Sequence, residues 1–326
     1  MSIRTRLTEA LGIAHPVLLA PMDGLADARL TAAVSAAGGL GILGGGYGNE
    51  QWLVRELDVL AQSHIRYGVG FITWSMAKQA RLLDLALERN PVAIMLSFGD
   101  VRPYAEKIVG AGVLLICQVQ TLAMAKQAVA AGANCIVAQG AEAGGHGMLR
   151  GTIALVPEVV DAVGSSVPVV AAGGIADGRG LAAALMLGAS GVLMGTRFYA
   201  TAEAAAPQKA KERIRAATGD DSLRSIVFDI ARRNVWPGSF TGRCLRNTYA
   251  ERWFGHEDEL LRNEAELARY AAGRGDGNFD VAAVIAGESA GLIREISGAG
   301  AVIDRMVRDA KVLLANASSA VKPDAK

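Results

Sequence analysis

One histidine stands in a chemically distinctive setting. It closes the glycine-rich segment Gln139-Gly140-Ala141-Glu142-Ala143-Gly144-Gly145-His146, which follows an apolar run, 134–138, typical of a buried strand. A loop this rich in glycine lets its backbone approach a flat or phosphorylated ligand closely. The imidazole is the only side chain of the loop that titrates near neutral pH. We therefore interpret His146, one of four histidines in the chain, as an active-site base that faces a cofactor.

Two further glycine turns are suited to a phosphate group. Gly173-Gly174 follows the apolar run 167–171, and Gly195-Thr196 follows the run 191–194. Both turns offer unobstructed backbone N–H groups, and the second adds a hydroxyl. Asp177, shortly after the first turn, stands where a helix should begin, so we expect it to act as an N-cap and not as a ligand.

The spacing of apolar runs predicts the elements that position these residues. Short β-branched runs alternate with Ala- and Leu-rich helical segments, a pattern typical of βα units with a parallel sheet. We predict eight strands, at 17–20, 41–43, 67–72, 92–96, 113–117, 134–138, 167–171 and 191–194. This pattern fits an α/β fold of the (β/α)8 TIM barrel type, in which chemistry gathers at the carboxyl ends of the strands. A doubly wound open sheet is the structural alternative.

The alternation stops near residue 200. Residues 201–326 are mostly helical in pattern, with charged segments at 208–216 and 257–270, and they hold too few strand candidates for a second sheet. We therefore predict a cofactor-binding barrel over residues 1–200 and a helical cap or substrate region over 201–326. The final helix of the chain should pack back on the barrel.

Composition excludes several classes of function. A formal net charge of +1 on 326 residues gives no electrostatic reason to expect nucleic acid or an anionic membrane as a partner. The longest uncharged stretches change from helical to strand-like patterning midway, and no apolar signal core follows the N-terminus. The three cysteines are widely spaced, which indicates buried thiols. The chain has no spacing of residues typical of metal ligands. We expect a cytoplasmic protein without a metal.

Six segments carry a family resemblance. They are Ala20-Pro21-Met22, Ala37-Gly38-Gly39-Leu40-Gly41, the His146 segment, Ala172-Gly173-Gly174-Ile175-Ala176-Asp177-Gly178-Arg179-Gly180, Met194-Gly195-Thr196-Arg197-Phe198 and Ala286-Gly287-Glu288-Ser289-Ala290-Gly291-Leu292-Ile293. In this order they resemble the nitronate monooxygenase family, formerly called 2-nitropropane dioxygenases. The resemblance implies a TIM barrel that binds FMN, with a helical substrate domain.

The same resemblance implies roles for individual residues. His146 falls on the family's catalytic histidine. The implied flavin contacts, together with the phosphate turns, are Met22, Gly70, Thr73, Gln118, Gln139, Gly144, Gly145, Gly173, Gly174, Gly195 and Thr196. Two departures leave substrate size and polarity open: Asp23 stands where many relatives have a neutral residue, and the loop after His146 is short.

The implied reaction is oxidation of alkyl nitronates or nitroalkanes by O2 to a carbonyl compound and nitrite. A neutral His146 would remove the α-carbon proton of the nitroalkane. The implied partners are a small-molecule substrate and O2, while the use of NAD(P)H and a homodimer stay open.

Two alternatives remain. Related barrels with a similar Glu-Ala-Gly-Gly-His loop are FMN-dependent NAD(P)H oxidoreductases that reduce enoyl thioesters or quinones. The chain could also be a barrel that binds FMN or another phosphate compound without catalysis. Fast flavin bleaching by NADH would favour a reductase, and a colourless protein that takes up no FMN would favour the non-catalytic alternative.

Overall fold

A closed ring of eight parallel strands forms the centre of the computed structural model, which describes residues 3–238 and 240–317. Leu40, directly before the last strand of the sheet, pairs with Leu18 and exchanges backbone hydrogen bonds of 3.0 Å with Val17 and Leu19 in the first. The ring is thus the predicted TIM barrel, and an open doubly wound sheet is excluded. In sheet order the strands are β1 (Val17–Leu19), β9 (Gly191–Met194), β8 (Val169–Ala172), β6 (Cys135–Gln139), β5 (Leu114–Val119), β4 (Ala93–Ser97), β3 (Tyr67–Ile72) and β2 (Gly41–Gly44).

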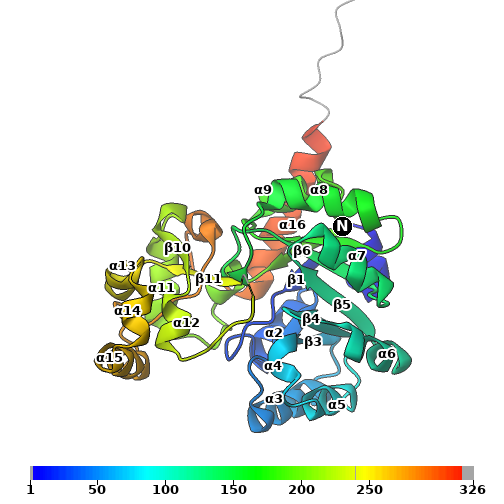
Figure 1. Cartoon of the computed structure of the whole chain (residues 1–326). Helices are drawn as coiled ribbons and strands as arrows, with labels where there is room; N and C mark the ends of the chain where they lie inside the picture. The colour runs from blue at the N-terminus through cyan, green and yellow to red at the C-terminus, as the bar shows by residue number, and fades with distance from the viewer. Residues whose placement is uncertain (1–2, 239, 318–326) are drawn as a thin grey trace, which may run out of the picture.

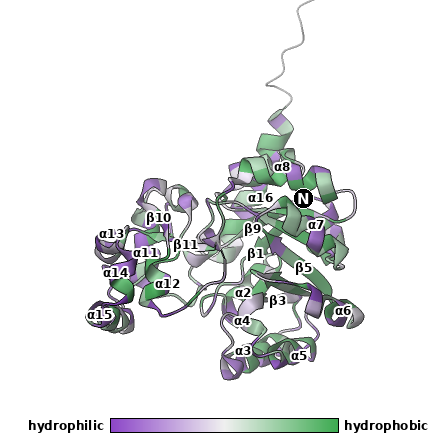
Figure 2. Ribbon diagram, in the orientation of Figure 1, coloured by the Kyte–Doolittle hydropathy of each residue, from purple (hydrophilic) through white to green (hydrophobic). Residues whose placement is uncertain are grey.

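All eight predicted strands are confirmed, and their bounds agree to within two residues. Each strand is a continuous apolar run because both of its faces are buried. Side chains such as Leu18, Ile42, Met95, Ile116 and Val170 form one cluster, distinct from a larger one that joins the strands to the helices. Figure 2 shows the strands in green, the hydrophobic colour, with purple residues gathered on peripheral helices such as α3 and α15.

Helices surround the barrel. Asp177 caps the helix after β8 by accepting hydrogen bonds from Arg179 N and Gly180 N, which confirms its expected role. Over the described residues, no helix combines the length and apolarity needed to cross a bilayer. The helices of this part are α1 (Arg6–Leu11), α2 (Ala28–Ala36), α3 (Glu50–Gln62), α4 (Thr73–Met76), α5 (Arg81–Leu87), α6 (Arg102–Gly110), α7 (Leu122–Ala130), α8 (Thr152–Val163), α9 (Gly178–Met186) and α10 (Thr196–Tyr199).

A cap is inserted between α10 and the last helix, α16 (Ala299–Asn316), which packs against α9 and α2 of the barrel. The cap elements lie to one side of the barrel in Figure 1. Most cap elements share a core that includes Phe228, Tyr249, Trp253 and Tyr270, while residues 208–216 and 288–292 contribute to another cluster. The cap elements are α11 (Gln208–Ala216), η1 (Gly219–Asp221), β10 (Ser222–Ser225), α12 (Val227–Ala231), β11 (Thr241–Leu245), α13 (Thr248–Trp253), α14 (Glu257–Leu261), α15 (Glu264–Gly275) and η2 (Glu288–Leu292).

A second, three-stranded sheet joins the cap to the barrel, so the expectation that the C-terminal part forms no second sheet is wrong. Its antiparallel order is β10, β11 and β7 (Gly145–Gly147), and β7 is the end of the glycine-rich segment. In this sheet His146 pairs with Gly242 of β11. A strand of two glycines and one histidine carries no strand signal, because glycine is depleted in strands. The assignment of residues 1–200 and 201–326 to two separate domains stays a prediction.

Candidate active site

The largest concentration of predicted site residues lines a cavity of about 580 Å³ between the carboxyl ends of the barrel strands and the cap. This is the end of the barrel at which chemistry is expected. Thr73 does not line it: its side chain is buried at the start of α4, and its hydroxyl lacks a hydrogen-bond partner among the described residues. The predicted residues that do line the cavity are Met22, Gly70, Gln118, Gln139, Gly144, Gly145, His146, Gly173, Gly174, Gly195 and Thr196.

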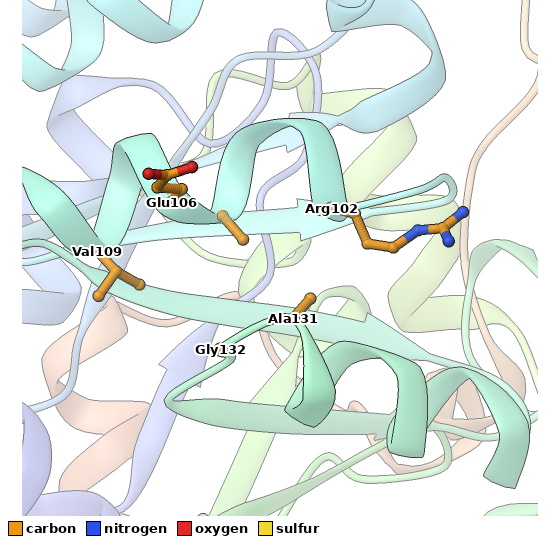
Figure 3. Close-up of a pocket in the computed structure, with 6 residues that line it drawn as sticks. Arg102, Glu106, Val109, Ala131 and Gly132 are labelled. Carbon is orange, nitrogen blue, oxygen red and sulfur yellow. The ribbon is translucent and has the colours of Figure 1, made fainter.

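A smaller cavity of about 250 Å³ lies on the outside of the barrel, between α6 and the end of α7. Figure 3 shows Arg102, Glu106 and Val109 on one side of it, and Ala131 and Gly132 on the other. None of the residues that the sequence singles out contributes to this lining. We therefore place the candidate site in the larger cavity.

His146 is held by a carboxylate from the cap. Its Nε2 lies 3.0 Å from Oδ1 and 2.9 Å from Oδ2 of Asp229 in α12. The two side chains are 7% and 8% exposed, so the contact is shielded from solvent. A neutral imidazole in this contact carries its proton on Nε2, which leaves the Nδ1 lone pair as the acceptor. Asp229 thus fixes both the orientation and the tautomer of a ring suited to accept a proton.

The protonation of His146 follows from its burial. Desolvation lowers the pKa of the imidazole below its ordinary value, and the nearby cations Arg232 and Arg224 act in the same direction. The hydrogen bond and negative charge of Asp229 raise the pKa but do not outweigh the burial. The ring is therefore neutral at neutral pH, as a general base must be.

An aromatic wall covers the histidine. Trp236, from the loop between α12 and β11, stacks on the imidazole with ring centroids 3.4 Å apart and planes inclined by 9°. Its indole N–H donates to the hydroxyl of Tyr47 at 3.1 Å, which ties the cap loop to the barrel. The wall consists of Tyr47, Trp74, Phe98, Trp236 and Phe240, in mutual edge-to-face contacts. It limits the access of water to the imidazole.

Glutamine side chains hold the backbone of His146. Gln139, at the end of β6, donates from Nε2 to the carbonyl of His146 at 3.0 Å. Its Oε1 accepts from Gln118 at 3.0 Å and from the buried Gln120 at 2.7 Å. Gln118 and Gln139 are therefore tied into this amide network while they face the cavity, and Gln120 extends the network beyond the residues predicted from sequence.

Two arginines of the second sheet donate hydrogen bonds to the backbone of the glycine-rich segment. Arg224 donates to the carbonyls of Ala141 at 2.9 Å, Ala143 at 3.2 Å and Thr241 at 2.5 Å, and Arg243 donates to Ala141 at 3.0 Å. Burial, reinforced by the charge of Arg243, lowers the pKa of Arg224 to about 10. Charged donors of the second sheet thus help to fix the segment.

We expect Arg224→Met to lower the free energy of unfolding by about 2–3 kcal/mol, because it leaves partly buried carbonyls without their charged donor. Urea denaturation followed by circular dichroism measures this change. The matched control is Arg215→Met, on the exposed face of α11, which should change the free energy by less than about 0.5 kcal/mol. If Arg224→Met lowers the free energy of unfolding no more than the control does, the hydrogen bonds of Arg224 add no stability.

Glu142 has a structural role. Its carboxylate accepts from the backbone N–H of Thr152 at 2.9 Å and from the Thr152 hydroxyl at 2.8 Å, at the start of α8. Glu142 thus ties the glycine-rich segment to the start of α8.

The two phosphate turns face the cavity. Gly173 and Gly174 have φ angles of 102° and 75°, in the region that favours glycine. Thr196 begins α10 directly after Gly195, and its hydroxyl accepts from Gly287 N at 2.9 Å. The hydroxyl of Ser97, at the end of β4, also belongs to a residue of the lining and is buried without a partner among the described residues. The sequence gives no signal for Ser97, since the residues after β4 carry no motif.

Comparisons with known proteins agree with this geometry. A family model described as nitronate monooxygenase matches residues 4–63 and 50–309. Nitronate monooxygenase npaC of Metarhizium robertsii is 37% identical, over 90% of each chain. The Mycobacterium tuberculosis (3aS,4S,5R,7aS)-5-hydroxy-7a-methyl-1-oxo-octahydro-1H-indene-4-carboxyl-CoA dehydrogenase is 31% identical, over 99% of this chain and 100% of its own. The structure of FabK from Thermotoga maritima superposes with a TM-score of 0.86 at 31% identity, over 98% of this chain and 100% of that one. The chain therefore belongs to the nitronate monooxygenase family and is a flavin-dependent oxidoreductase.

Proposed function

We propose that the chain uses FMN to oxidise alkyl nitronates and nitroalkanes with O2, giving a carbonyl compound and nitrite. The observation that carries this proposal is that His146 lines the cavity while its imidazole is paired with Asp229 behind it. A buried, neutral imidazole with its tautomer fixed is suited to remove a weakly acidic proton next to a nitro group. The family membership supports the same class of substrate.

The residues present fit FMN. The cavity of about 580 Å³ lies within the usual range for cofactor and ligand sites. The turns Gly173-Gly174 and Gly195-Thr196 follow the last two barrel strands, where many barrels bind phosphate. Ser97 adds a buried hydroxyl that has no protein partner among the described residues, as expected of a group that serves a ligand. We propose that these residues hold the cofactor, which supplies the electron transfer from the substrate to O2.

The chain's own residues have separable roles in this proposal. His146 Nδ1 takes the α-carbon proton, and Asp229 stabilises the imidazolium that results. Gln139 holds the His146 backbone in place, so the ring cannot withdraw from the substrate. The aromatic wall, through Trp236, keeps water away from the imidazole and the reacting carbon.

Anaerobic titration tests the function. The purified, FMN-loaded protein should lose its flavin absorbance when propane 2-nitronate is added, and should retain it with NADH or NADPH. With air admitted, nitrite should then form from propane 2-nitronate. Bleaching by NADH alone, without nitrite formation from the nitronate, would refute the proposal.

A second candidate is an FMN-dependent NAD(P)H oxidoreductase that reduces an enoyl thioester or a quinone. The close superposition on FabK and the identity to the carboxyl-CoA dehydrogenase favour it. In that reaction His146 would donate a proton or only line the pocket. Fast bleaching by NADH or NADPH in the same titration identifies this alternative.

We also propose a cytoplasmic location. The described cysteines, Cys117, Cys135 and Cys244, are free and buried. Burial raises the pKa of Cys117 and of Cys244 to about 12, so these thiols stay protonated and unreactive. Free thiols of this kind are typical of a reducing compartment. A homodimer stays a prediction.

A further inference from the structure

Arg232 is a buried cation that the roles described so far do not use. It follows α12 directly, lines the cavity, and its side chain is only 15% exposed. Its Nε donates to the carbonyl of Phe228 at 2.9 Å. Its Nη2 lies 3.6 Å from Oδ1 of Asp229, which is too long for a hydrogen bond. Within residues 3–238 and 240–317, the terminal N–H groups of this guanidinium therefore have donor capacity left for a ligand.

Arg232 is paired with Asp229 but keeps hydrogen-bond donors that this carboxylate does not occupy. Asp229 lies close to Arg232, but its two oxygens are already within hydrogen-bond distance of His146. Of the described residues that line the cavity, the other charged ones are Asp23 and Arg274. Desolvation raises the pKa of the Asp23 carboxyl, and the charges of Arg274 and Arg232 act against that rise. The cap side of the cavity thus presents guanidinium donors of Arg232 that are available to the oxygens of a ligand.

We propose that Arg232 binds the two oxygens of the substrate's nitro or nitronate group. This inference rests on the proposed function and names the side chain that selects its substrate class. A nitronate is planar and shares one negative charge between two oxygens, and a guanidinium presents paired N–H groups in a matching plane.

The position of Arg232 supports this assignment. Asp229 contacts His146 at 2.9 Å and lies 3.6 Å from Arg232, so the imidazole and the guanidinium, which both belong to cavity-lining residues, flank the same carboxylate. A ligand whose oxygens reach Arg232 therefore holds its adjacent carbon on the side of His146. Removal of the α-carbon proton moves negative charge onto the oxygens, and Arg232 stabilises that charge as it develops.

Binding of a carboxylate that mimics the nitronate tests the inference without turnover. Isobutyrate carries a carboxylate where propane 2-nitronate carries its nitrogen and two oxygens, so it presents two oxygens that share one negative charge, while isobutyramide has about the same size and no charge. Isothermal titration calorimetry on the FMN-loaded protein should show tighter binding of isobutyrate. Arg232→Met should weaken isobutyrate by about tenfold or more, and isobutyramide by less than about threefold.

Two further variants sharpen the test. Arg232→Lys keeps the charge but loses the paired donors, so we expect a loss of about threefold or more for isobutyrate. The matched control is Arg233→Met, because the adjacent arginine is 62% exposed and pairs with Glu264 instead of lining the cavity. This control should bind both ligands as the wild type does.

The inference is overturned if the wild type binds isobutyrate no better than isobutyramide, or if Arg232→Met weakens both ligands equally. Equal weakening would mean that Arg232 only positions Asp229. If Arg232→Met fails to fold, Arg232→Lys decides, and wild-type affinity in that variant overturns the inference. Nitrite formation by the wild type is a separate readout, so failure of the proposed function is distinguished from failure of this assignment.

Discussion

Replacing His146 by asparagine should lower kcat/KM for a neutral nitroalkane by about 10²–10⁴-fold, the range that a general base contributes. The same variant should oxidise a preformed nitronate within about threefold of the wild type, because that substrate has already lost its α-carbon proton. Nitrite release from 2-nitropropane and from propane 2-nitronate measures the two effects.

The matched control for this experiment is His256→Asn. His256 lies in the cap with a side chain that is 60% exposed and contacts Glu259, and it does not line the cavity. It should leave both activities unchanged. An equal loss on both substrates in His146→Asn would assign the histidine to binding or to the flavin environment, and the proton-transfer role would have to be abandoned.

Replacing Asp229 by asparagine should lower kcat/KM for the neutral nitroalkane by about 10²–10³-fold, because an amide no longer holds the tautomer with the proton on Nε2. The carboxamide can donate to Nε2 instead, which places the proton on Nδ1 and removes the acceptor from the cavity. The preformed nitronate should again be affected much less. The comparison variant is Asp280→Asn, a carboxylate of the cap that is 69% exposed and pairs with Arg213.

The pH profile of Asp229→Asn distinguishes a change in the pKa of His146 from a loss of protein stability, because only the former shifts the profile in a defined direction. Asp229 raises the pKa of His146 against the larger, opposite influence of burial. Without the carboxylate the pKa falls further, so the imidazole stays neutral to a lower pH. The acidic limb of kcat/KM against pH should therefore shift to lower pH in the variant. A shift to higher pH would show that Asp229 is not the group that controls this titration.

The barrel could be predicted from the sequence because its strands are local signals. The bounds of β3 and β9 agree with their predicted ranges, since each is a short apolar run buried on both faces. The rim could be predicted for the same reason: once the strands are placed, the residues after them must meet at one end of the barrel. The glycine turns and His146 therefore come together in the cavity without any knowledge of long-range contacts.

The partners of His146 could not be predicted in this way. Asp229 lies 83 residues further along the chain, in a helix whose pattern is that of an ordinary cap helix. The pairing of Asp229 with His146 depends on how β11 pairs with β7, which contains two glycines. A glycine-rich strand of this kind has no recognisable sequence pattern. The contacts of Trp236 with Tyr47 and with the imidazole could not be predicted either, because its neighbours in the chain do not indicate them.

The route of the chain through the cap has a consequence for biosynthesis. By the time β9 leaves the ribosome, every strand of the barrel has been made, but the helix that covers the surface beside α2 and α9 has not. That helix, α16, supplies Ile303, Met306, Val307 and Ala310 to the buried layer. Until translation has passed through the cap, the nascent barrel therefore exposes to water the apolar surface that α16 later covers. A chain that terminates anywhere within the cap would contain all eight strands but would remain aggregation-prone, and we expect it to be bound by chaperones or degraded by proteases.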